Sequence, residues 1–261
     1  MRIIPVLDIM AGQVVRGIAG RRSEYRPIVS RLTSSCRPLD VAQAFRTHFG
    51  LTELYLADLD AIAGAASAWP IYVELRAHGF HLWVDAGVRN RQQAAALADH
   101  GIEGIVVGLE TVSGPETLAA LCQEFGSDRM IFSLDLKGGQ PLGAVSAWRS
   151  PDAWSIAEQA VELGVRRLIV LDLERVGMGA GAGTEELCRN LAERFPQLEI
   201  VAGGGVRDRS DLERLEQCGV RAALVASALH DGRMQEFVVP PSGGARRAPP
   251  EGGTTNPIAP T

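Results

Sequence analysis

The sequence predicts an α/β fold, a closed (β/α)8 barrel of the TIM type built from two similar half-barrels. Three observations support this: short aliphatic runs recur about eight times, amphipathic stretches separate them, and the chain repeats itself once. Its 46% hydrophobic and 22% charged residues are typical of a globular protein. An open, doubly wound sheet is the runner-up, because periodicity alone does not show that a sheet closes.

Eight segments have the composition of strands that are buried on both faces. They are rich in Ile, Val and Leu and mostly lack alternating polar residues, as in a parallel sheet covered by helices. The predicted strands are Arg2–Leu7, Glu53–Ala57, His81–Val84, Gly104–Val107, Met130–Leu134, Arg167–Leu171, Glu199–Ala202 and Ala222–Val225.

Helical periodicity is found between these strands. Apolar residues recur three or four positions apart, and a glycine follows each of the clearest stretches as the usual stop signal. The predicted helices and their glycines are Arg91–His100 with Gly101, Ser155–Leu163 with Gly164, and Asp211–Gln217 with Gly219.

The second half of the chain repeats the first. The matches are Asp58 with Asp172 at an offset of 114, Asp85–Arg91 with Gly203–Arg209 at 118, and Asp8 with Asp135 at 127. Each unit holds four predicted strands. Two half-barrels favour closure, because one half alone leaves open sheet edges.

Length and composition predict the bounds of the folded domain and exclude several classes of protein. We expect one domain over residues 1–239 and a disordered tail from Pro240 to Thr261, which holds 6 Pro and 4 Gly. A formal net charge of −5 gives no basic footprint for nucleic acid. The chain has no signal peptide or membrane-length apolar run, so we expect a cytoplasmic protein. The oligomeric state stays open.

The cysteines do not indicate a metal site. None forms a C-x-x-C motif or a Cys/His cluster with metal-ligand spacing, so we expect no metal and, for most of them, buried free thiols. The four are Cys36, Cys122, Cys188 and Cys218.

Two aspartates, Asp8 and Asp135, end predicted strands at matching places of the repeat. Barrel active sites lie at the carboxyl ends of the strands, and these two strands are opposite each other. Two carboxyl groups across a cleft can act as general acid and general base if the site raises the pKa of one of them. A lone aspartate would more simply cap its loop. A symmetric pair favours catalysis.

A second matched pair, Asp58 and Asp172, ends two further strands. Both are modest candidates for positioning substrate or ordering loops. Salt bridges to neighbouring arginines explain them at least as well.

Small residues after the last two strands indicate a phosphate site. Gly203, Gly204 and Gly205 let backbone N–H groups approach an anion. Ala226 and Ser227 precede a short helix whose N-terminus can face the anion. A tight turn is the alternative. The position after strands 7 and 8 favours phosphate, so the expected partner is a small phosphorylated metabolite.

The equivalent position in the first half differs. Gly87 and Gly108 could still present donors, but Asp85 and Glu110 place carboxylates where an anion would sit. Two like charges about 4 Å apart repel by roughly 4 kcal/mol at an effective dielectric constant of about 20. This repulsion would abolish phosphate binding here unless an arginine offsets the charge of the acids. Alternatively, the acids pair with arginines and point away from the site. The candidate arginines are Arg16, Arg89 and Arg91.

Five motifs together resemble the HisA/HisF family of histidine biosynthesis. The resemblance runs from Ile3 to about Gly232, and the motifs are fairly specific as a set. They begin at Pro5 (PVLDIMAGQVVRG), Ala57 (ADLD), Ser133 (SLDLKGG), Leu171 (LDLERVG) and Gly203 (GGGV).

The resemblance implies an Amadori rearrangement of an aminoaldose to an aminoketose, with no cofactor. By the same resemblance, Asp135 is the general acid that opens the ribose ring and Asp8 is the general base that removes the C2 proton. The nominal activity is the ribotide isomerase step of histidine biosynthesis, on a phosphoribosyl-amine substrate. The family's cyclase branch uses the same strand ends with ammonia from a glutaminase partner.

Departures from the family pattern keep other functions open. Asp85-Ala86 replaces a Gly-rich turn, and Leu109-Glu110 replaces a small or hydroxyl residue, whereas histidine-pathway substrates carry a phosphate at each end. One alternative is a related paralogue that acts on a singly phosphorylated substrate in tetrahydromethanopterin-linked one-carbon metabolism. The alternative from another class is a barrel that only binds a phosphometabolite or a partner subunit.

Overall fold

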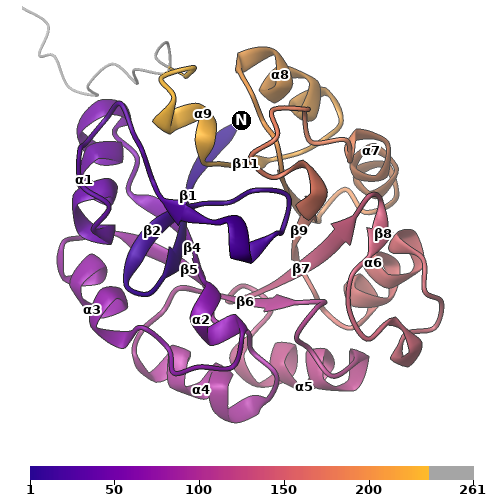
Figure 1. Cartoon of the computed structure of the whole chain (residues 1–261). Coiled ribbons are helices and arrows are strands. Elements are labelled where there is room, and N and C mark those ends of the chain that lie inside the picture. Colours follow the sequence, from indigo (N-terminus) through magenta and orange to yellow (C-terminus); the bar gives the residue numbers. More distant parts are fainter. Residues whose placement is uncertain (235–261) are drawn as a thin grey trace, which may run out of the picture.

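A computed structural model describes residues 1–234 as a closed ring of parallel strands surrounded by helices (Figure 1). The ring order is β11-β10-β9-β7-β6-β5-β4-β1, and β1 pairs with β11, so the sheet closes. The prediction of a barrel is confirmed over that of an open sheet. The ring strands are β1 (Arg2–Met10), β4 (Glu53–Asp58), β5 (His81–Asp85), β6 (Gly104–Gly108), β7 (Met130–Lys137), β9 (Arg167–Asp172), β10 (Glu199–Gly203) and β11 (Ala222–Val225).

Helices cover the outside of the ring, and the three helices predicted from periodicity are confirmed within two residues at each end. The longer helices are α1 (Pro38–Phe49), α3 (Trp69–Ala77), α4 (Arg91–Asp99), α5 (Pro115–Phe125), α6 (Ala153–Glu162), α7 (Glu185–Arg194) and α8 (Arg209–Gln217). Single-turn elements at the strand ends are α2 (Leu59–Ile62), α9 (Ser227–His230) and the 3-10 turns η1 (Arg22–Glu24), η2 (Val145–Ala147) and η3 (Leu173–Arg175).

The internal repeat has a structural counterpart. In each half the first strand folds back into a hairpin, with β2 (Gln13–Arg16) after β1 and β8 (Gln140–Pro141) after β7. A short β3 (Arg26–Pro27) extends the first hairpin. The side chains of Asn90 and Asp208 cap α4 and α8 in the same way, each accepting a backbone N–H three residues on. The two half-barrels therefore share local detail as well as topology.

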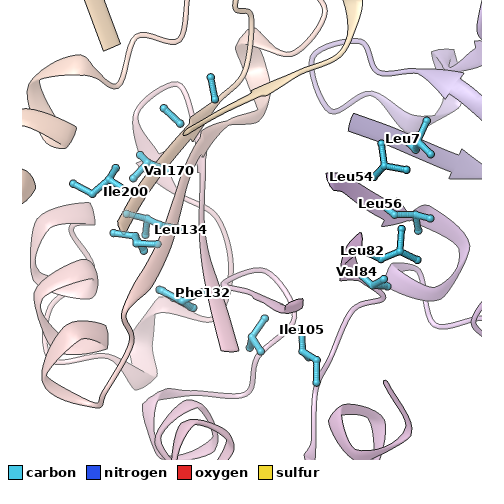
Figure 2. Close-up of a cluster of buried hydrophobic side chains, with 14 of the residues drawn as sticks. Leu7, Leu54, Leu56, Leu82, Val84, Ile105, Phe132, Leu134, Val170 and Ile200 are labelled. Atoms are coloured by element: carbon cyan, nitrogen blue, oxygen red, sulfur yellow. The ribbon is translucent and has the colours of Figure 1, made fainter. Parts of the chain in front are cut away.

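Alternation along the strands gives the barrel two apolar layers. Outward residues such as Leu54 and Leu56 pack under the helices, and Figure 2 shows part of this outer layer. Inward residues such as Tyr55 and Trp83 fill the barrel centre. By the same alternation, Asp85 faces inward two residues after Trp83. The inward face thus changes from apolar to acidic as the strands approach their carboxyl ends.

Other expectations concern the chain as a whole. The cysteines are unpaired, and three of them, all but Cys36, are buried free thiols as expected. Over residues 1–234 no group of His, Cys, Asp and Glu could hold a metal ion. No helix in that range is long and apolar enough to cross a membrane. The predicted tail, Pro240–Thr261, lies outside the described residues.

Candidate active site

A cavity of about 430 Å³ lies at the carboxyl ends of the strands. Asp8 and Asp135 both line it, as do Asp85, Glu110 and Ser227. The loops that follow several different strands thus contribute to one wall. Sites in (β/α)8 barrels are built in this way.

Strand register places the two aspartates on opposite sides of the cavity. Asp8 on β1 pairs with Ala57 of β4, and Asp135 on β7 pairs with Leu171 of β9. β1 and β7 are four places apart in the ring of eight strands, so they face each other across it. Both side chains point inward, because they continue the inward faces of their strands.

Asp8 is a carboxyl group without a hydrogen-bond partner among residues 1–234. Its side chain is half-buried. Burial raises its pKa from 3.8 to about 7; nearby Arg22 opposes this shift and Asp85 adds to it. The carboxyl group is therefore about half ionised at neutral pH.

Asp135 is more deeply buried, with 6% of its surface exposed. Its Oδ1 accepts the hydroxyl of Ser133 at 2.7 Å. Burial, reinforced by the charge of Asp85, raises its pKa to about 8, although the Ser133 hydrogen bond opposes the shift. At neutral pH this group is mostly protonated. It can donate a proton where Asp8 can accept one.

Asp85 is a third inward carboxyl group beside the pair. Its Oδ1 accepts the backbone N–H of Gly87 at 3.0 Å, and its Oδ2 accepts the hydroxyl of Tyr55 at 3.3 Å. Burial raises its pKa to about 6, partly offset by the Gly87 hydrogen bond. A Cβ added to Gly108 would lie 3.0 Å from Asp135 Oδ2 and 3.9 Å from Asp85 Oδ2, so these oxygens are at most about 7 Å apart.

The glycine-rich turn after β10 forms another part of the cavity wall, together with Ala226 and Ser227. Gly205 has φ +82°, and a Cβ there would lie 2.8 Å from the carbonyl oxygens of Arg175 and Gly181. Only glycine fits this close approach. The N–H groups of Gly204 and Gly205 donate to no acceptor among residues 1–234.

Two loops meet over the mouth of the barrel. The Ala19 N–H donates to the Val176 carbonyl at 2.8 Å, which joins the loop after β2 to the loop after β9. At Gly177, with φ +73°, a Cβ would lie 2.1 Å from the carbonyl oxygen of Gly17. Arg22, from the first of these loops, pairs with Glu110 at 2.7 Å. The cavity is thus partly covered.

Several residues predicted for the site lie elsewhere. Arg16 pairs with Asp231, and Arg89 donates to the backbone carbonyls of Ile62 and Gly87. Among residues 1–234, Glu110 therefore pairs with none of the arginines suggested from the sequence. Five residues predicted for the site do not line the cavity as described over residues 1–234. They are Arg16, Gly87, Gly108, Asp172 and Gly203.

Six charged or phenolic residues of the cavity wall were not predicted: Arg21, Arg22, Tyr25, Tyr55, Lys137 and Arg233. Two of them could have been found from the sequence. Tyr55 interrupts an aliphatic strand, and Lys137 lies two residues after Asp135 and is the only lysine of the chain. Reading each strand with a period of two would have assigned both to the inward face.

Asp172 orders a loop. Its carboxylate accepts the backbone N–H groups of Gly138 at 3.1 Å and Gly139 at 2.8 Å, and it caps η3 through Glu174 N–H at 3.0 Å. Asp58 caps α2 in the same manner. Salt bridges to arginine, the alternative suggested from the sequence, are not formed by either side chain within residues 1–234.

We expect Asp172→Ala to loosen the loop that follows Asp135. Losing the shared acceptor should lower the free energy of unfolding by about 1–3 kcal/mol. Amide hydrogen exchange at Gly138 and Gly139 should become faster. Urea denaturation and exchange measure both effects, with the exposed Asp128→Ala as control. Unchanged exchange at the two glycines would contradict this role.

Comparison with known proteins gives a consistent result. A family model described as "Histidine biosynthesis protein" matches residues 2–235. Relatives from Halothermothrix orenii, Deinococcus radiodurans and Listeria monocytogenes are each named as a 1-(5-phosphoribosyl)-5-((5-phosphoribosylamino)methylideneamino) imidazole-4-carboxamide isomerase. The chain is 30%, 31% and 31% identical to them, over 90%, 89% and 91% of its length and 96%, 95% and 97% of theirs. On this evidence the chain belongs to the histidine biosynthesis protein family.

Proposed function

We propose that this protein is an isomerase that converts a phosphoribosyl-amine aminoaldose to the aminoketose by an Amadori rearrangement. The observation that supports this most directly is the pair of inward carboxyl groups, Asp8 and Asp135, on opposite strands of one cavity. The relatives named as ribotide isomerases support the same reaction class. The ribotide of those names is the nominal substrate.

Asp135 acts as the general acid in the first step. Its proton goes to the ring oxygen of the ribosyl group while the bond from C1 to that oxygen breaks. The nitrogen lone pair forms the C1=N bond of an open-chain Schiff base. A buried acid with a pKa of about 8 holds its proton at neutral pH and can release it as the ring opens.

Asp8 acts as the general base in the second step. It removes the C2 proton, and the electron pair passes through C1 to the nitrogen, which gives an enolamine. Loss of the proton from the C2 hydroxyl and gain of one at C1 then complete the ketone and the amine. Hydrogen and electrons are conserved within the substrate, so the balance needs no external oxidant or reductant.

Anion binding positions the substrate. Gly204, Gly205 and Ser227 line the cavity after β10 and β11, and Arg233 lies on the same wall. Holding a phosphate there fixes the distance from the sugar to both carboxyl groups, and such positioning lowers the barrier by avoiding entropy loss in the reaction step. A barrel that only binds its ligand would not need two opposed carboxyl groups with raised pKa values.

Growth of a histidine auxotroph tests the proposal. In a strain that lacks the ribotide isomerase, the chain expressed from a multicopy plasmid should restore growth without histidine, and the Asp8→Asn/Asp135→Asn chain should not. Purified protein should convert the ribotide in heavy water with deuterium entering at C1. Soluble protein that neither supports growth nor converts the ribotide, even at high enzyme concentration, would contradict the ribotide as substrate, and failure also with its two mono-dephosphorylated analogues would contradict the isomerase function.

A further inference from the structure

The two ends of the cavity are built from equivalent elements of the two half-barrels. On one side, Asp8, Ala57 and Asp85 are register partners across β1, β4 and β5. On the other side, Asp135, Leu171 and Gly203 are register partners across β7, β9 and β10. Asp85 therefore occupies the place that glycine occupies in the second half.

The end formed after β10 and β11 is suited to an anion. The N–H groups of Gly204, Gly205 and Ser227 donate to no acceptor among residues 1–234. Arg233 lines this end of the cavity, and none of the described acids that line the cavity follows β10 or β11; its partner Asp231 lies outside the wall and also pairs with Arg16. Unused donors and positive charge are what a phosphate requires.

The end formed after β5 and β6 has the opposite character. The Gly87 N–H is already used, because the Asp85 carboxylate accepts it at 3.0 Å. The protein thus fills this anion position with its own carboxylate. Arg22 and Glu110 neutralise each other at 2.7 Å, which leaves Asp85 and a net charge of −1 for these three groups. The free carboxylate lone pairs and the hydroxyl of Tyr55 face a cavity.

From this asymmetry we propose that the substrate carries a single phosphate, bound after β10 and β11, and presents an uncharged or cationic group with hydroxyl or amine donors to Asp85. Asp85 is then the residue that determines specificity at that end. The proposal rests on the proposed isomerase function and narrows its substrate class. A second phosphate is disfavoured by like charge and because the Asp85 carboxylate already accepts the Gly87 N–H.

Counting bound phosphate tests the asymmetry without any turnover. Calorimetric titration with inorganic phosphate should give one site per wild-type chain. The Asp85→Gly/Glu110→Gln chain should give two, because it frees the Gly87 N–H and Arg22 together. Asp128→Gly/Glu124→Gln, which removes two exposed acids elsewhere, should still give one. Two sites or none in the wild type, or one in the cavity double variant, would overturn the proposal.

Kinetics separate this proposal from the isomerase function itself. Wild-type enzyme should use one of the two mono-dephosphorylated analogues of the ribotide with a kcat/KM at least about tenfold above that of the ribotide, and Asp85→Gly should reverse this preference. Turnover with the ribotide preferred by the wild type would overturn the single-phosphate proposal but leave the isomerase intact. No turnover of any of the three compounds would count against the isomerase, whatever the phosphate count.

Discussion

Replacing Asp8 or Asp135 with asparagine should lower kcat by about 10² to 10⁴-fold, the usual contribution of one proton-transfer group. Asparagine keeps the size of each side chain but can neither take up the C2 proton nor supply one to the ring oxygen. Steady-state rates with the ribotide and its mono-dephosphorylated analogues measure the loss. Asp128→Asn, on the exposed surface, is the matched control and should retain the wild-type rate.

The pH dependence of kcat/KM should follow the two carboxyl groups. Asp8 must be ionised to act as a base, so activity should rise as pH passes its pKa of about 7. Asp135 must be protonated to act as an acid, so activity should fall above its pKa of about 8. The result is a narrow bell. A rate that stays constant from about pH 5 to 9 would contradict this assignment.

Stability measurements show whether the asparagine variants lose activity through lost proton transfer or through misfolding. Both carboxyl groups have folded-state pKa values above the ordinary 3.8. At these two groups the folded state therefore binds more protons, and their contribution to wild-type stability should be greatest below about pH 4 and decline as pH rises towards 8. Asparagine removes that decline. At pH 9 each variant should be at least as stable in urea as the wild type, and a marked loss of stability would mean that the side chains act mainly in folding.

Strand positions were predictable because the signals are local. Each apolar run is bounded by glycine or by a polar loop, and burial on both faces leaves no other use for so many Val, Ile and Leu residues. The repeat extends to local detail that was not predicted, since Asn90 and Asp208 match at the offset of 118 and cap α4 and α8 in the same way. Local sequence and symmetry thus sufficed for the ring and for the placement of Asp8 and Asp135.

Ion pairs between distant loops were not predictable from local sequence. Arg22 and Glu110 are 88 positions apart, and Arg16 and Asp231 are 215 apart. The choice of partner depends on how loops cross the barrel mouth, and the sequence offered many arginines for each acid. Sequence reasoning therefore identified the unusual acid at Asp85 but not the hydrogen bond by which it takes up the Gly87 N–H.

A carboxylate placed at the phosphate end should weaken substrate binding strongly. Ser227 lines the cavity beside the turn that carries the unused N–H groups. At an effective dielectric constant of about 20, two unit charges about 4 Å apart interact by about 4 kcal/mol, which corresponds to roughly 10³ in affinity. Ser227→Asp should therefore raise KM by about 10² to 10³-fold, with a much smaller change in kcat. Ser227→Ala should raise KM by no more than about tenfold, because the backbone donors remain.

The two Ser227 variants also measure what Asp85 already does in the wild type. If Ser227→Asp raises KM and lowers phosphate affinity together, then one carboxylate is enough to close an anion site in this barrel, as Asp85 is inferred to do at the other end. A KM for Ser227→Asp within about threefold of wild type would show that no phosphate is bound beside Ser227, and the anchor would have to be sought elsewhere in the cavity.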